Sequence, residues 1–208
     1  MSDNYAKLVQ NNLKSLYKKR SNKELTDCLP GTQDKDCVVF NAFGSTCRIS
    51  PEGIILKNEK QEGIIGILIS LYALYSGTDS CIETPFKAFK DFPNSTPYAG
   101  AFATHTQNTL IPHVKKIEKN MDKIKTGLKG QDAPADTGGD FAFVVWPLPK
   151  IALCYIFYEE DEDFPASVTC LYSNNAANFI PIDGLADIGE YTSKEIIGIC
   201  STYPADDI

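Results

Sequence analysis

An apolar run at residues 151–158 that opens directly into five acidic residues constrains this chain more than any other feature. The run, IALCYIFY, carries no charged side chain, which is typical of a central strand buried on both faces. The acids at residues 159–163 therefore lie where that strand leaves the core. Because neighbouring negative charges repel one another, solvation, a cationic partner or a bound ion has to offset their cost. The sequence predicts a buried strand that ends in an acidic turn.

A second apolar segment, residues 141–146, precedes this strand and is separated from it by the sequence PLPK. The two segments predict a β-hairpin over residues 141–158. Antiparallel pairing places the start of the first strand beside the end of the second. We therefore expect Asp140 to lie at the same end of the sheet as Asp161 and Asp163.

The rest of the chain alternates irregularly between helical and strand-like segments. A second hairpin is predicted over residues 37–49, hinged at Gly44, and a further strand over residues 167–172. Helical periodicity occurs at residues 4–19, 61–75, 98–128 (with a break or kink at Pro112) and 183–200. Because this order lacks a βαβ rhythm, it favours an α+β fold with mostly antiparallel strands packed against helices. We expect one domain over residues 3–202.

Charge and hydropathy exclude two classes of partner. The formal net charge of −7 argues against broad binding to nucleic acid, which needs a basic face. The most apolar segment, residues 64–75, is shorter than the roughly 20 residues that a membrane span needs. The N-terminal segment is polar and has no apolar region of the kind found in signal peptides. We expect a cytoplasmic protein that binds neither nucleic acid nor membranes.

The seven cysteines are odd in number and include no CxxC pair. This usage is typical of a reducing compartment rather than of a disulfide framework. The spacing of Cys28, Cys37 and Cys47 matches no zinc or iron–sulfur pattern, so no metal site is predicted there, and whether they bind anything stays open.

The acidic turn allows more than one chemistry. Its carboxylates are the ligands that Ca²⁺ and Mg²⁺ prefer, but the order of residues differs from that of an EF-hand loop. Asp161 or Asp163 could instead act as a general acid or base if burial raised its pKa. A simpler interpretation is a solvated strand end, with Phe164 anchored in the core and Pro165 fixing the turn. Asp140 could likewise only cap a turn.

Aromatic residues form a further set of candidates. Trp146 and Tyr158, together with Tyr98, Phe102 and Tyr155, could line a pocket for a planar ligand, although aromatic residues at such spacings more often belong to a core. The chain lacks the GxGxxG, GxxxxGK[ST], GxSxG and HExxH motifs. The common nucleotide-binding, esterase and zinc-protease functions therefore have no support.

Several short motifs occur in a characteristic order along most of the chain. They are FKAFKDFP at residues 86–93, Tyr98 with Phe102, Gly139-Asp140 with Leu148-Pro149, DEDFPA at residues 161–166, and Phe179-Ile180-Pro181 before Asp183. In these elements the chain resembles the prokaryotic family described as domain of unknown function 3786.

The resemblance implies an origin in anaerobic bacteria or archaea, and some relatives look linked to one-carbon and corrinoid metabolism. The chain lacks the clustered cysteines of the iron–sulfur module that some relatives carry. Ser173 lies near the place where the family tends to have an acidic residue. Gly184 replaces the second acid of another family element and leaves Asp183 alone, which weakens a shared carboxylate site.

Three functional hypotheses follow. The first is an accessory protein of anaerobic metabolism that binds a small ligand or an unidentified cofactor. The second is an enzyme that uses Asp140, Asp161 or Asp163 as a general base or as a ligand of a divalent metal, although no catalytic motif is recognised. The third is an acidic protein-interaction module that docks a basic partner. The candidate ligand-binding residues are Asp140, Trp146, Tyr158, Asp161, Asp163, Phe164 and Asp183.

Overall fold

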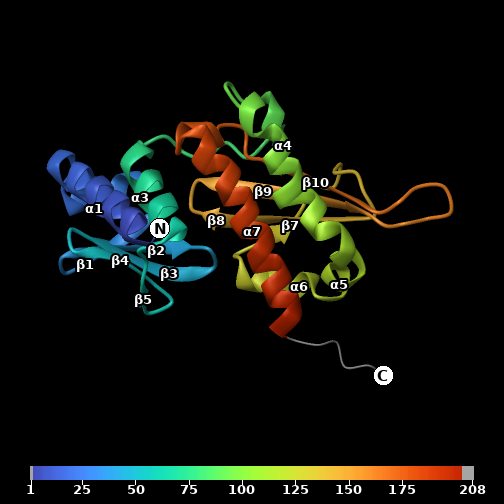
Figure 1. Ribbon diagram of the computed structural model, residues 1–208, viewed down its shortest axis with the longest axis horizontal. Coiled ribbons are helices and arrows are strands. Elements are labelled where there is room, and N and C mark those ends of the chain that lie inside the picture. The colour runs from blue at the N-terminus through green and yellow to red at the C-terminus, as the bar shows by residue number, and fades with distance from the viewer. Residues whose placement is uncertain (1, 203–208) are drawn as a thin grey trace.

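The described part of the chain, residues 2–202, forms two antiparallel five-stranded sheets packed against helices in the computed structural model (Figure 1). Side chains are described from Asn4 onward. Sheet A contains β1 (Gly31–Asp34), β2 (Cys37–Ala42), β3 (Ser45–Ser50), β4 (Gly53–Leu56) and β5 (Glu59–Lys60), side by side in chain order. Sheet B has the order β6-β10-β9-β8-β7 and contains β6 (Lys87–Ala88), β7 (Gln131–Asp132), β8 (Phe141–Leu148), β9 (Ile151–Tyr158) and β10 (Ser167–Tyr172). The predicted α+β fold with antiparallel strands is confirmed.

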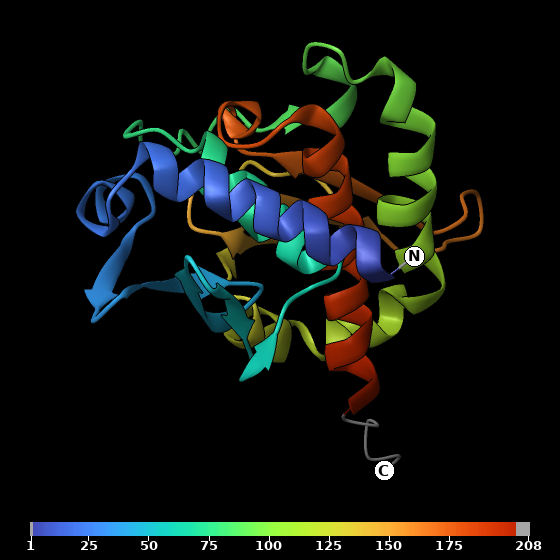
Figure 2. The same cartoon turned by 60° about the vertical axis from the view of Figure 1, so that its left-hand side comes forward.

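Sheet A grows from the predicted hairpin over residues 37–49, which is confirmed as β2 and β3 paired in register Phe40 to Cys47. Alternate residues of β2, including Val38 and Phe40, are buried, as expected for a strand with one face toward a core. The helices α1 (Ser2–Lys19) and α3 (Ile64–Tyr75) pack along each other beside this sheet (Figure 2). The short α2 (Asn22–Cys28) leads into β1.

The tip of the β2–β3 hairpin joins sheet A to sheet B. The N–H of Phe43 donates to the carbonyl of Pro147 at 2.6 Å, and the Phe43 ring is buried. Gly44 has φ +74°, and a Cβ at this position would collide with the carbonyl oxygen of Gly127. Only glycine combines this left-handed backbone with so close an approach.

Two cations donate hydrogen bonds to carbonyl groups just beyond the C-terminal end of α3. The buried Lys150 lies in the β8–β9 turn and donates from Nζ to the carbonyl of Gly77 at 2.6 Å. Arg20 donates from Nη1 to the carbonyl of Ser76 at 2.6 Å. Cations are favourable here because the helix dipole is negative at this end. Burial nevertheless lowers the pKa of Lys150.

The central position of β9 in sheet B explains the apolar run that precedes the acidic turn. β9 lies between β8 and β10, and all its residues from Ile151 to Phe157 are buried. The predicted hairpin over residues 141–158 is confirmed, with Phe141 paired to Phe157 and an irregularity between Val145 and Leu148. One face, called here the inner face, packs against helices. The opposite, outer face carries a smaller apolar cluster that includes Val144, Cys154 and Trp146.

The chain over residues 96–127 is more finely divided than the helical segment predicted for residues 98–128 with a break or kink at Pro112. It forms 3₁₀ segments, α4 (Ala99–Phe102), a π-helical turn at Ala103–Gln107, a 3₁₀ segment at Asn108–His113, α5 (Val114–Lys119) and α6 (Met121–Gly127). Pro112 lacks the N–H that would continue an α-helix. Gln107 also bends toward the sheet, where its Oε1 accepts the N–H of Cys170 at 3.1 Å. The two-residue strand β6 pairs only with Leu171 and Tyr172 of β10 and therefore leaves the N–H of Cys170 without a strand partner.

The last helix, α7 (Ile182–Thr202), lies along this helical layer (Figure 1). Buried hydroxyl groups fix its position on the sheet. Tyr155 and Ser193 share a hydrogen bond of 3.1 Å, and Ser193 donates to the carbonyl of Thr106 at 2.7 Å. Tyr172 donates to the carbonyl of Leu185 at 2.8 Å. These bonds satisfy polar groups that would be costly to bury alone.

Candidate functional site

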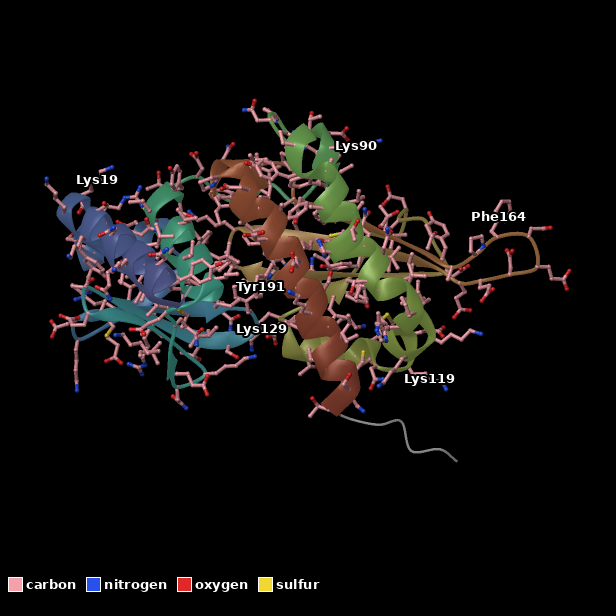
Figure 3. All side chains as sticks on the ribbon, viewed as in Figure 1. Lys19, Lys90, Lys119, Lys129, Phe164 and Tyr191 are labelled. Atoms are coloured by element: carbon pink, nitrogen blue, oxygen red, sulfur yellow. The ribbon has the colours of Figure 1, made fainter. Side chains whose placement is uncertain are left out.

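The acidic turn, residues 159–166, connects β9 to β10 and projects beyond the end of sheet B (Figure 3). Asp161 organises it, because Oδ1 accepts the N–H groups of Asp163 at 2.8 Å and Phe164 at 2.7 Å. The N–H of Asp161 in turn donates to the carbonyl of Phe164 at 3.0 Å. One oxygen of this carboxylate therefore holds the turn closed.

Asp140 lies beside the turn, as the hairpin geometry predicted. Its Oδ2 accepts the N–H of Glu159 at 2.7 Å, and its own N–H donates to the carbonyl of Phe157 at 2.9 Å. The preceding Gly139 has φ +93°, and a Cβ there would lie 2.6 Å from Cγ2 of Ile156. Glycine is thus needed to bring Asp140 against the strand end. Its carboxylate fixes the base of the acidic turn.

Phe164 corrects the expectation that an aromatic ring anchors the turn in the core. The side chain is 71% exposed and lies on the projecting part of the turn (Figure 3). The chain reverses within the turn through the Asp161 bonds and does not need an apolar anchor. Glu162 and Asp163 are also exposed, so negative charges lie next to an unburied aromatic ring.

Trp146 and Asp183 do not join the acidic turn. Trp146 is six positions along β8 from Asp140, which is about 20 Å at the rise of an extended strand. Asp183 follows the opposite end of β10 and lies in the first turn of α7, where Oδ1 accepts the N–H of Gly184 at 2.9 Å. Figure 1 shows the turn and the start of α7 at different ends of sheet B.

A groove of about 550 Å³ crosses the outer face of sheet B. We call it the outer groove. Its floor consists of Cys154, Ile156 and Leu171, and its walls come from residues 84–86 and 134–138. Leu171 and Phe86 pack in the same apolar cluster as Trp146. The structure thus places Trp146 on the face that carries the groove, although far from the acids.

Tyr158 links the two regions. It is the last residue of β9 and is 42% exposed, and its hydroxyl lies close to Gly138 at the groove wall. Asp136 and Thr137 supply polar groups along that wall. Residues 134–138 face residues 84–86 across the groove, and no motif of the sequence indicates that these two segments meet.

Within residues 4–202, no three His, Cys, Asp or Glu side chains come together in an arrangement that could hold a metal ion. Among the described cysteines, burial raises the pKa of Cys154 on the groove floor to about 11. A thiol with so high a pKa stays protonated near neutral pH and is a poor nucleophile. None of the helices formed by residues 2–202 is both long and apolar enough to cross a lipid bilayer.

This geometry defines a class of protein: an α+β fold with a projecting acidic turn and a groove on the outer face of one sheet. The chain belongs to the family described as Domain of unknown function (DUF3786), whose model matches residues 22–195. That match covers both sheets, the outer groove and the acidic turn. Searches of curated proteins and of solved structures give no match.

Proposed function

We propose that the protein binds a small ligand in the outer groove. The observation that carries the proposal is the groove itself, whose volume of about 550 Å³ falls within the roughly 300–1,000 Å³ typical of small-molecule sites. Its floor is apolar and its walls add a few polar groups. In small-molecule sites the apolar lining usually buries the ligand, and the polar groups fix its orientation.

The lining favours a flat, largely apolar ligand. The floor is a sheet surface, and Phe86 and the proline residues Pro85 and Pro134 add rigid walls. Asp136 and Thr137 can accept or donate hydrogen bonds at one side of such a ligand. The hydroxyl of Tyr158 lies close to Gly138 at the groove wall, and Trp146 packs in the apolar cluster on the same sheet face.

Fluorescence of Trp146, the single tryptophan of the chain, tests this proposal. Metabolites below 1 kDa from anaerobically grown cells are fractionated and titrated into the protein. We expect a saturable change in emission with at least one fraction. A Thr137→Phe variant, which narrows the groove, should abolish it, whereas Thr104→Phe on the exposed surface of the π-helical turn should retain it. Equal responses of the two variants would contradict the proposal.

The resemblance to relatives linked to one-carbon and corrinoid metabolism extends this proposal to an accessory role in anaerobic metabolism in the cytoplasm. In this role the protein would hold a small molecule or an unidentified cofactor rather than transform it. The missing catalytic motifs favour this binding role. Cell fractionation with an antibody against the protein tests the location.

A second function, docking of a basic protein, is favoured by the exposure of Phe164. An unburied aromatic ring surrounded by acids resembles an interface hot spot with a charged rim. Because Asp161 holds the turn closed, the variants that test charge alone are Glu162→Lys and Asp163→Lys. A photo-cross-linking residue at position 164 should trap a basic partner, and either reversal should reduce the yield. An unchanged yield would exclude this function.

The carboxylate-enzyme hypothesis gains no comparable support. Asp140 and Asp161 each use an oxygen to accept backbone N–H groups, which is a structural task. Neither lies in the outer groove. We therefore rank this hypothesis below the two binding functions.

A further inference from the structure

A second cavity, separate from the outer groove, lies on the helical side of sheet B at the base of the acidic turn. Its volume is about 390 Å³, near the lower end of the range for small-molecule sites. We call it the inner cavity. The segment from Ile111 to Lys115 forms one wall, and the two ends of the acidic turn form the other.

The apolar surface of this cavity is rigid. Pro112 fixes the break between the 3₁₀ segment and α5, and Val114 is anchored in the core. Pro165 and Ala166 form the opposite side, where the turn re-enters β10. The bond from the Glu159 N–H to Asp140 holds the first end of the turn in place. A ligand would therefore enter a site whose walls are already ordered, which lowers the entropic cost of binding.

Charges of both signs line the same cavity. Lys115 comes from the start of α5, and Glu159 and Glu160 come from the start of the acidic turn. None of these three residues forms an ion pair with another side chain of residues 4–202. The ammonium group and the two carboxylates thus border one apolar space without neutralising each other.

We propose that the inner cavity binds a zwitterionic amino acid with a short aliphatic side chain. The ligand ammonium group pairs with Glu159 and Glu160, and the ligand carboxylate pairs with Lys115. The side chain packs on Ile111, Pro112 and Pro165. A zwitterion satisfies both charge signs at once, whereas a simple cation leaves Lys115 unpaired and a simple anion faces two carboxylates.

Calorimetric titration of the full chain tests this site with three probes of similar shape. The probes are L-valine, isobutylamine, which lacks the carboxylate, and isovalerate, which lacks the ammonium group. We expect saturable binding of L-valine and binding of each single-charge probe weaker by about tenfold or more, which corresponds to roughly 1.4 kcal/mol. Equal affinities for the three probes, or no binding of L-valine, would overturn the proposal.

Charge-neutral variants locate the site. Lys115→Gln and Glu160→Gln should each weaken L-valine binding by about tenfold, a loss of roughly 1.4 kcal/mol. Lys119→Gln, one turn further along α5 (Figure 3), is an exposed matched control that should leave L-valine binding unchanged. The exposed Glu118→Gln is a second such control. All four residues are on the surface, so circular dichroism should report unchanged folding. Equal effects of the controls and the cavity variants would overturn the assignment. Because Thr137→Phe alters the outer groove and leaves the inner cavity unchanged, this variant should bind L-valine normally.

Discussion

Replacement of Gly44 by alanine should weaken the contact between sheet A and sheet B and destabilise the fold. Gly44 has φ +74° at the tip of the β2–β3 hairpin, and a Cβ there would meet the carbonyl oxygen of Gly127. The hairpin must therefore shift away from α6. That shift breaks the hydrogen bond from the Phe43 N–H to the Pro147 carbonyl, which measures 2.6 Å, and partly exposes the Phe43 ring.

The expected loss follows from these contacts. A left-handed backbone at a non-glycine residue costs about 1–2 kcal/mol. Loss of the hydrogen bond costs about 0.5–1.5 kcal/mol, and exposure of a buried phenylalanine up to roughly 3 kcal/mol. We therefore expect a decrease of about 2–6 kcal/mol in the free energy of unfolding. Since domains have a total stability of about 5–15 kcal/mol, this change should be large.

Urea denaturation followed by circular dichroism measures the effect. Gly198→Ala is the matched control, since a Cβ at this helical position meets no heavy atom within 4 Å. Helix propensity predicts that this control gains about 0.5–1 kcal/mol. If Gly44→Ala changed the stability by less than about 1 kcal/mol, the described junction between the sheets would be wrong.

Three further predictions concern the core, the pH dependence and the turn. Tyr155→Phe removes the hydroxyl that bonds Ser193 and should lower the free energy of unfolding by about 1–2 kcal/mol in the same assay; a neutral result would contradict the buried network. Burial raises the pKa of the Cys47 and Cys154 thiols to about 12 and about 11. The protonated thiols contribute fully to the free energy of unfolding below pH 9, the pKa of a cysteine in the unfolded chain. This contribution is lost as the pH rises from 9 toward the higher pKa values of the folded state, so the free energy of unfolding measured from pH 7 to 11 should fall above about pH 9. A flat profile would refute this. Phe164→Ala should change stability by less than about 0.5 kcal/mol, because the ring is exposed, and a larger loss in thermal denaturation would show that it is packed.

Elements with strong local patterns could be predicted from the sequence. The run IALCYIFY identifies β9 because a strand buried on both faces needs no polar alternation. The helical period and flanking residues also place α7 within two residues of its observed bounds at Ile182 and Thr202. Asp140 could be placed beside the turn because antiparallel pairing alone fixes which strand ends meet.

Elements that depend on distant contacts could not be predicted. Pro112 predicts a break or kink in residues 98–128, but the π-helical turn at residues 103–107 also depends on Gln107, whose side chain accepts a hydrogen bond from β10 where no neighbouring strand reaches. The position of Phe164 depends on how Asp161 closes the turn, which composition does not reveal. The outer groove arises from two loops about 50 positions apart, and only the sheet order brings them together.

The central claim, that this protein holds a small ligand, is tested most directly by native mass spectrometry with elemental analysis. The protein is purified without oxygen from its own cells, as the wild type and as the Thr137→Phe variant. We expect a wild-type species heavier than the 208-residue chain by the mass of one organic ligand, and a variant at the mass of the chain alone. The same added mass on both proteins would place the ligand elsewhere, and a wild type at the mass of the bare chain would contradict the claim.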